Sequence, residues 1–344
     1  VSAGRDHTVR VWDIDSQKPQ ATINAHATGL KGLVVDRRLQ QSYSYEEASP
    51  GIRVCELRGM NDYSMKRVNS SDGLCVRCLR WSPDGTRLAA VGSHNGKRIC
   101  AIWSADSDNP FAMQEIEYSR SVNWSADGSR LIRYDETGAI KVDDASTGTT
   151  LNSWRWNNEL QAGGGQGTGV GFVSPDGRFA FETTGSGSFR LRQLKTLEII
   201  ANSVGNFGDP YQVRAAWRPD SQAVVFGAWN PPKVLKVSGA RESLRSVGEL
   251  DGCRAMAWHP SGQMLALGEV TGRVHFVDYA KRQRLLSVNA HMALISDLHV
   301  SPDGLRLASA GEDGTVAIWD TANGDELFRF SPEGVKNFSQ VRWS

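Results

Sequence analysis

A short signature recurs about every 43 residues along this chain, and a fixed period of that length is typical of a stacked array of similar units. In each copy an apolar run ends in a large residue, often Trp, and a turn rich in Ser, Pro, Asp and Gly follows. The copies of this signature are Trp81–Gly85, Trp124–Gly128, Val173–Gly177, Trp217–Asp220, Trp258–Gly262 and Val300–Gly304. The period therefore predicts a chain of repeats.

Each copy has enough β-forming sequence for four strands and no convincing helix. Pro presets φ for a tight turn and Asp-Gly tolerates a left-handed step, so the signature predicts a hairpin. The run after the turn, such as Leu88–Gly92, is short and apolar, which indicates a buried strand. A third run ends at an aromatic residue, as in Thr315–Asp320, and a more polar fourth run completes the unit. We expect an all-β fold.

The pairs Trp12-Asp13 and Trp319-Asp320, together with the Ser-Pro-Asp-Gly turns, resemble the Trp-Asp (WD) repeat family over essentially the whole chain. The resemblance implies a β-propeller whose blades are four-stranded antiparallel sheets. It also implies a hydrogen-bonded structural tetrad in one copy, formed by His291, Ser309, Asp313 and Trp319.

The two ends of the chain are expected to share one blade. The sequence opens on a second strand, Val1–Ala3, and closes after a first strand, Phe338–Trp343. Pairing of these strands closes the ring of a propeller and removes its exposed sheet edges. This composite copy keeps Ser2, Asp6 and Trp12 of the tetrad but has no His at the matching place.

We expect a single domain, residues 1–344, with eight blades. The alternative is seven blades, if the irregular stretch from Leu30 to Arg67 is a long insertion. The expected blades span residues 336–344 with 1–25, 30–68, 74–116, 119–156, 168–202, 211–247, 252–289 and 294–330.

Charge and cysteine content narrow the function classes. The 39 basic and 38 acidic residues leave a net charge of +1, so no global field favours nucleic acid or membranes. The five cysteines are odd in number, and Cys75 and Cys78 would point to opposite faces of a strand, so we expect reduced thiols, no metal and no cofactor. We expect a cytoplasmic protein. Since the sequence lacks an initiating Met and stops inside a repeat, we expect it to be part of a longer polypeptide.

A basic column appears when the first strands are aligned on their last residue and the position four residues earlier is compared. The basic members of this column are Lys31, Arg77, Arg120 and Arg254. In WD-repeat propellers this strand lines the central channel, so the resemblance places these side chains near one channel mouth. We expect them to bind an acidic peptide, a phosphate-bearing ligand or an acidic surface of a neighbouring domain of the same polypeptide. The alternative is that each pairs with a loop carboxylate of its own chain.

Three tryptophans lie outside the repeat phase and form a candidate aromatic hot spot for a partner protein. They are Trp154, Trp156 and Trp229. Exposed aromatic anchors often dominate binding energy at interfaces. The alternative is packing against the glycine-rich segment that follows Trp156.

These observations favour a non-catalytic protein-interaction scaffold or sensor. The regular turns look like those of bacterial WD-repeat proteins, which are often attached to signalling domains, so a signalling or defence role is expected by analogy. One alternative is a propeller that senses an anion or a small ligand. A more distant one is an eight-bladed quinoprotein-like enzyme, because Asp144–Gly148 followed by Trp154 is faintly similar to a docking motif of that class.

Overall fold

The computed structural model of this protein describes residues 1–4, 6–13, 16, 18–24, 30–36, 41–46, 52–56, 65–68, 74–104, 110–117, 119–125, 127–135, 139–154, 171–183, 189–196, 198–203, 213–227, 232–237, 245–246, 250, 252–331 and 337–343. Every regular element among these residues is a β-strand. In this part of the chain no helix is long and apolar enough to span a membrane.

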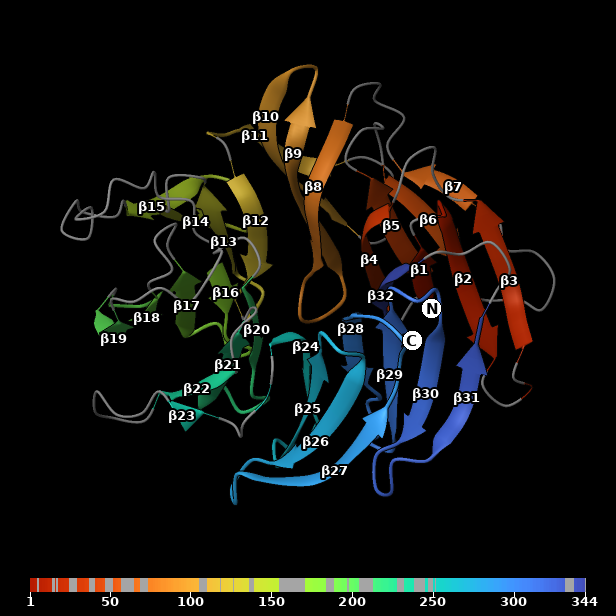
Figure 1. The fold of residues 1–344 in the computed structure, drawn as a ribbon. Helices are drawn as coiled ribbons and strands as arrows, with labels where there is room; N and C mark the ends of the chain where they lie inside the picture. Colours follow the sequence, from red (N-terminus) through yellow and green to blue (C-terminus); the bar gives the residue numbers. More distant parts are fainter. Residues whose placement is uncertain are drawn as a thin grey trace. The chain divides into compact units, whose positions relative to one another are not determined.

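The strands within the described ranges form eight four-stranded sheets, drawn in Figure 1 in the colours of the sequence. Each strand pair whose register is described is antiparallel, as in β29 with β30 and in β13 with β14. The chain divides into two compact units, one of Val1–Val76 with Val247–Ser344 and one of Arg77–Ser246. The prediction of an all-β fold built from four-stranded antiparallel sheets is confirmed.

The first unit contains four of these sheets. The sheet in the order β3-β2-β1-β32 consists of β1 (Ser2–Gly4), β2 (Thr8–Asp13), β3 (Lys18–Asn24) and β32 (Phe338–Val341). The others run in chain order: β4 (Leu30–Asp36), β5 (Gln41–Glu46), β6 (Ile52–Glu56) and β7 (Met65–Val68); β24 (Cys253–Trp258), β25 (Met264–Glu269), β26 (Arg273–Asp278) and β27 (Gln283–Asn289); β28 (Ile295–Val300), β29 (Arg306–Gly311), β30 (Val316–Asp320) and β31 (Glu326–Phe330). The stretch from Leu30 to Arg67 thus contributes strands to a sheet like the others.

The second unit also contains four sheets in chain order. They are β8 (Leu74–Trp81), β9 (Arg87–His94), β10 (Lys97–Ser104) and β11 (Pro110–Glu115); β12 (Ser119–Trp124), β13 (Arg130–Asp135), β14 (Ile140–Asp144) and β15 (Thr150–Trp154); β16 (Gly171–Val173), β17 (Phe179–Thr183), β18 (Phe189–Gln193) and β19 (Ile199–Ser203); β20 (Arg214–Trp217), β21 (Ala223–Gly227), β22 (Lys233–Lys236) and β23 (Arg245–Ser246).

In several described turns after a first strand, side-chain hydrogen bonds inside the turn fix the hairpin. In Ser301–Gly304 the Leu305 amide donates to Oδ1 of Asp303 at 2.9 Å, and the Arg306 amide donates to Oγ of Ser301 at 2.9 Å. Gly304 has a φ of 80°, a backbone conformation that residues other than Gly rarely adopt. The signature of the sequence is therefore a turn that satisfies its own backbone donors.

In three sheets a tryptophan at or just after the end of the first strand links its sheet to the preceding one. Nε1 of Trp124 donates to the carbonyl of Arg80 at 2.9 Å, and Nε1 of Trp217 donates to the carbonyl of Phe172 at 3.0 Å. In the other unit Nε1 of Trp343 donates to the carbonyl of His299 at 2.8 Å. Each indole spans the step from one repeat to the next, which explains why Trp recurs at this phase.

The first and last strands of the chain lie in one sheet. In β1 and β32, Ser2 pairs with Val341 and Ala3 with Gln340, and the Arg342 amide donates to the Val1 carbonyl at 2.9 Å. Both ends are drawn beside this pair in Figure 1. Residues more than 330 positions apart thus complete a single four-stranded sheet.

Candidate interaction site

Three of the four basic residues of the column, Lys31, Arg120 and Arg254, lie at a repeated β-bulge. In the first strand of five sheets, one residue has no partner in the register with the second strand. These residues are Lys31, Arg120, Arg254, Ser296 and Ser339. A bulge bends the strand and changes the direction of the extra side chain. The position is therefore a structural feature of the repeat, with a different residue in different sheets.

The four basic residues of the column fall into two pairs. Lys31 and Arg254 lie in the first unit, and Arg77 and Arg120 lie in the second, on the first strands of consecutive sheets. The Arg77 side chain is exposed and that of Arg254 is half-buried. Both make an interaction within the protein. For Lys31 and Arg120 the structure describes the backbone only.

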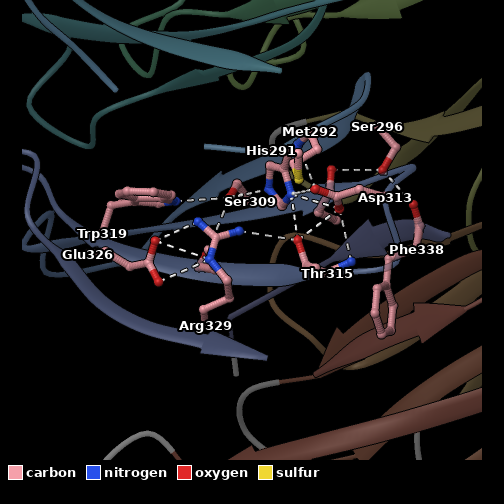
Figure 2. A network of polar contacts seen from close by, with 12 residues as sticks. His291, Met292, Ser296, Ser309, Asp313, Thr315, Trp319, Glu326, Arg329 and Phe338 are labelled. Atoms are coloured by element: carbon pink, nitrogen blue, oxygen red, sulfur yellow. Dashed lines mark hydrogen bonds and ion pairs between the residues drawn. The ribbon is translucent and has the colours of Figure 1, made fainter. Parts of the chain in front are cut away.

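Where the bulge carries serine, the side chain is used inside the fold. Oγ of Ser296 donates to the carbonyls of Phe338 and Ala310 at 2.5 and 3.0 Å (Figure 2). Oγ of Ser339 donates to the carbonyl of Ala3 at 3.2 Å. A short hydroxyl at the bulge therefore binds neighbouring strands.

The four residues predicted as a tetrad are joined by hydrogen bonds, as Figure 2 shows. Nε1 of Trp319 donates to Oγ of Ser309 at 2.9 Å, and the same Oγ lies 2.8 Å from Nε2 of His291. Nδ1 of His291 lies 3.1 Å from Oδ1 of Asp313. The chain of contacts runs from the third strand, through the second, to the segment before the first.

Asp313 is the charged end of this network. Burial opposes its ionisation, but hydrogen bonds from His291 and from the Met292 amide outweigh burial and hold its pKa well below the usual range. The Met292 amide donates to Oδ2 at 2.8 Å, and the Thr315 amide donates to Oδ1 at 3.0 Å. Asp313 thereby fixes the segment that leads into β28 and the turn between β29 and β30.

The sheet that joins the chain ends replaces the missing histidine with an arginine. Nε1 of Trp12 donates to Oγ of Ser2 at 2.8 Å, which reproduces the Trp–Ser step. Asp6 is paired with the buried Arg10, whose Nη2 lies 2.6 Å from Oδ2. The Arg10 guanidinium also lies over the Phe338 ring, 5.6 Å from its centroid. The sequence pattern shows the absent histidine but not this substitute.

Ser309 and Trp319 occupy two positions that can be located in every sheet by register, and we call them the tetrad pair. Trp319 stands opposite Leu307, two residues before Ser309. The same register in the sheet β12–β15 sets Asp143 opposite Leu131, two residues before Arg133. Arg133 and Asp143 are thus its tetrad pair.

In the sheet β12–β15 the tetrad pair is a buried ion pair. The Arg133 and Asp143 side chains are each 1% exposed. Nε of Arg133 contacts Oδ2 of Asp143, and Nη2 donates to Oδ1 at 2.8 Å. Ser119 and Thr150 contribute hydroxyl acceptors at 3.2 Å from the guanidinium. The bidentate geometry satisfies both charges inside the protein.

In the sheet β16–β19 the tetrad pair has the opposite polarity. Arg192 stands opposite Ala180, two residues before Glu182. Nε of Arg192 donates to Oε1 of Glu182 at 3.2 Å, while Oε2 is buried without a hydrogen-bond partner among the described residues. Burial raises the pKa of Glu182 to about 7, although Arg192 and Arg190 oppose the shift. The carboxylate is therefore less well satisfied than Asp143.

In the sheet β8–β11 the tetrad pair has lost its acceptor. Trp103 stands opposite Leu88, two residues before Ala90. Both side chains are buried, and Nε1 of Trp103 has no hydrogen-bond partner in the described part of the chain. Alanine here leaves a buried N–H unsatisfied, which costs free energy.

Two other sequence features have structural explanations. Asp144, the first residue of the segment similar to a quinoprotein motif, accepts hydrogen bonds from the Ser146 and Thr147 amides at 2.8 and 3.0 Å. Asp320 forms the same turn with the Ala322 amide. Cys75 is half-buried and Cys78 is buried, and no three His, Cys, Asp or Glu residues within the described ranges are grouped to hold a metal ion.

The predicted aromatic hot spot falls mostly outside the described residues. Trp154 ends β15, and only its backbone is described. Trp156 and Trp229 lie outside the described ranges. The hot spot therefore stays a prediction.

A family model, "WD domain, G-beta repeat", matches residues 65–107 and 282–320. The second match contains the whole tetrad. Eukaryotic translation initiation factor 3 subunit I of Candida albicans is 22% identical over 363 residues, which cover 95% of this chain and 89% of the yeast protein. WD repeat-containing protein WDS homolog of Arabidopsis thaliana is 24% identical, over 75% of this chain and 49% of the plant protein. These relatives are eukaryotic, so they give no support to the expected bacterial origin.

Solved structures share the fold. A chain of the computationally designed Ika8 protein superposes with a TM-score of 0.73 at 18% identity, covering 93% of this chain and 92% of that chain. A chain in the crystal structure of the Mitotic Checkpoint Complex gives a TM-score of 0.59 at 21% identity, covering 76% of this chain and 78% of that chain. The two matched segments are similar to WD40 repeats, and the four-stranded sheets together with these solved structures give the chain a β-propeller fold of four-stranded antiparallel blades.

Proposed function

We propose that this protein is a non-catalytic interaction platform, and that the bulged position of its first strands carries the residues that select the partner. The observation that carries the proposal is the constancy of the bulge in five sheets while its residue varies among Lys, Arg and Ser. Repeat proteins keep the scaffold constant and place binding residues at variable positions. The names of the relatives agree with this role, because one is a subunit of a translation factor and another chain comes from a checkpoint complex.

The chemistry of the basic column favours an acidic partner. Arg77 is exposed and Arg254 is half-buried, and arginine binds carboxylates and phosphates in a bidentate manner. A protein or a neighbouring domain with an acidic surface would supply several such groups. Sensing of a small anion is the second outcome that the same residues permit. The signalling context, the cytoplasmic location and the absence of nucleic-acid and membrane partners stay predictions.

The blades are proposed to form one ring of eight. The eight four-stranded sheets of the described part agree with one blade per repeat, and the pairing of β1 with β32 agrees with closure by the chain ends. Counting the blades in an experimental structure tests this, and seven blades would contradict it.

The platform is tested by charge reversal in the basic column. We would compare the wild type with a variant carrying Lys31→Glu, Arg77→Glu, Arg120→Glu and Arg254→Glu, using a pull-down from the native organism and direct titration with a poly-glutamate peptide. The matched control is Arg130→Glu with Arg178→Glu, two exposed arginines that follow Ser-Asp-Gly turns. Loss of binding in the first variant only is expected. Equal binding by all three proteins would remove the bulge residues from the site.

A further inference from the structure

One sheet of the first unit aligns a carboxylate, an imidazole and a hydroxyl. Nδ1 of His275 lies 2.6 Å from Oγ of Ser287, and Nε2 of the same ring lies 3.0 Å from Oε1 of Glu269. The second carboxylate oxygen of Glu269 accepts a hydrogen bond from Oγ1 of Thr271 at 2.8 Å. Neither the tetrad nor the bulge uses these residues.

The alignment follows from the register of three neighbouring strands. His275 of β26 stands directly opposite Ser287 of β27, and it stands opposite Leu267 of β25, two residues before Glu269. Side chains two residues apart share one face of a strand, so all three groups lie on the same face of the sheet. His275 is 1% exposed and Glu269 is 8% exposed, whereas Ser287 is exposed. Only the hydroxyl is accessible to a reagent in solvent.

The protonation state suits proton transfer from the hydroxyl. Burial lowers the pKa of His275 below its ordinary value, Arg284 and Arg273 act in the same direction, and Glu269 opposes them. The imidazole is therefore neutral at neutral pH. The negative charge of Glu269, 3.0 Å from Nε2, favours the tautomer protonated at Nε2, although the two atoms are not aligned for a hydrogen bond, and this tautomer leaves Nδ1 as the acceptor for Ser287. A nucleophile, its base and an orienting carboxylate are the parts of an activated serine.

We propose that Ser287 is a nucleophile that accepts an acyl group from an acyl phosphate. Oγ attacks the carbonyl carbon, its proton moves to Nδ1 of His275, and the bond between that carbon and the phosphate oxygen breaks. Inorganic phosphate leaves, the proton passes from His275 to solvent, and Ser287 carries an ester. The step occurs once per chain and is a modification of the platform.

The charges around Ser287 favour an anionic donor. Arg273 lies on the same strand face as His275. Its Nε donates to Oδ1 of Asn289 at 3.1 Å, which holds the guanidinium beside β27, the strand that carries Ser287. Arg284 lies three residues before Ser287 and is exposed. A phosphate leaving group would be stabilised by these cations.

The chain contains a matched internal control for this reaction. Ser153 of β15 stands opposite Lys141 of β14, at the register that Ser287 and His275 occupy in their sheet. Ser153 is also exposed, but the opposite side chain is a lysine whose Nζ lies 2.7 Å from Oε2 of Glu117. Ser153 is thus an equivalent hydroxyl without a neutral base.

The test measures acylation of both serines in one sample. The full chain is incubated with acetyl phosphate at neutral pH, and the acetylated peptides are quantified by mass spectrometry over time. Because a positioned general base contributes about 100-fold or more, we expect Ser287 to react about 100 times faster than Ser153. Equal rates at the two serines would overturn the proposal.

The pH dependence separates base catalysis from simple exposure, and it needs no variant. The rate at Ser287 should reach a plateau at neutral pH, above the lowered pKa of His275, while the rate at Ser153 should keep rising with hydroxide. Parallel profiles would contradict the role of His275.

The variant Glu269→Gln should move the Ser287 profile to lower pH, because it removes the charge that raises the His275 pKa. The variant His275→Gln should reduce the Ser287 rate to that of Ser153, and a circular dichroism spectrum and thermal unfolding curve like those of the wild type would show that the variant is folded.

Discussion

The sheets β28–β31 and β12–β15 fill the same two backbone positions with different chemistry. In the first, the indole of Trp319 donates to the hydroxyl of Ser309, and the network continues to His291 and Asp313. In the second, Arg133 and Asp143 form an ion pair with both side chains 1% exposed. The register is the same, so the repeat fixes where a buried polar contact lies and leaves open which groups make it.

The comparison shows that the two buried groups at these positions must satisfy each other's hydrogen bonds. The chemical type of the two groups can vary. A neutral pair costs little to bury, and loss of one partner leaves one unsatisfied group. A charged pair costs more to bury, and loss of one partner leaves an uncompensated charge. The sheets should therefore differ most in their response to removal of a single side chain.

The largest effect is expected from Asp143→Ala. The Arg133 guanidinium would remain buried without its carboxylate, so the free energy of unfolding should fall by about 3–5 kcal/mol in urea titrations. The double variant Arg133→Met with Asp143→Leu, which removes both charges, should recover most of this loss. A cost below about 1 kcal/mol for Asp143→Ala would mean that water reaches the pair.

The reversed pair in β16–β19 should give the next largest effect, through pH. The pKa of Glu182 is raised from 4.5 to about 7, so the folded protein binds this proton more tightly than the unfolded chain does. Its contribution to stability is present below pH 4.5 and is lost as the pH rises through about 7, by up to about 3 kcal/mol. Unfolding free energies measured from pH 4.5 to 8 should show this decline, and Glu182→Gln should flatten it. The same slope in both proteins would assign the decline to another group.

A smaller loss is expected from Ser309→Ala, which converts the tetrad pair of β28–β31 into that of β8–β11. The indole N–H of Trp319 and Nε2 of His291 would both lose their partner, so the free energy of unfolding should fall by about 2 kcal/mol. Ser2→Ala is the matched control, because Trp12 is half-buried and water can replace the lost acceptor. An equal cost at the two sites would show that burial of the indole does not set the effect.

The smallest effect is a gain, expected from Ala90→Ser. The register sets residue 90 where Ser309 stands relative to its tryptophan, so the new hydroxyl should accept the unsatisfied N–H of Trp103 and add about 1 kcal/mol. Ala89→Ser is the control, because Ala89 belongs to an apolar cluster with Ile102 and Leu131. Thermal unfolding should move upward for the first variant and downward for the second.

Periodicity and turn chemistry were enough to predict the four-stranded antiparallel sheets. These signals are local, because Pro, Asp and Gly act within a few residues of the turn. The column of residues four positions before the end of the first strand could also be found from the sequence, but its bulge could not, because no residue type marks it. Lys31, Arg254 and Ser296 share it without sharing chemistry.

The substituted tetrad pairs could not be predicted, because a motif search looks for Ser and Trp. Arg133 and Asp143 become equivalent to them only through strand register, and the same is true of Glu182 and Arg192. The role of Arg10 could not be predicted either, because the sequence shows that a histidine is missing but not which cation pairs with Asp6. The register of neighbouring strands and the packing of side chains carry this information, and no local sequence signal marks either.

The pairing of β1 with β32 has a consequence for the order in which the chain is made. A ribosome adds about 5–20 residues per second, so roughly 20–60 seconds separate the appearance of Ala3 from that of its partner Gln340. During that time β1, β2 and β3 are available, and β1 lacks its partner β32. An unpaired edge is a template for other strands. The sheet that contains β1 and β32 thus waits longer for its completing strand than the sheets whose four strands follow one another along the chain.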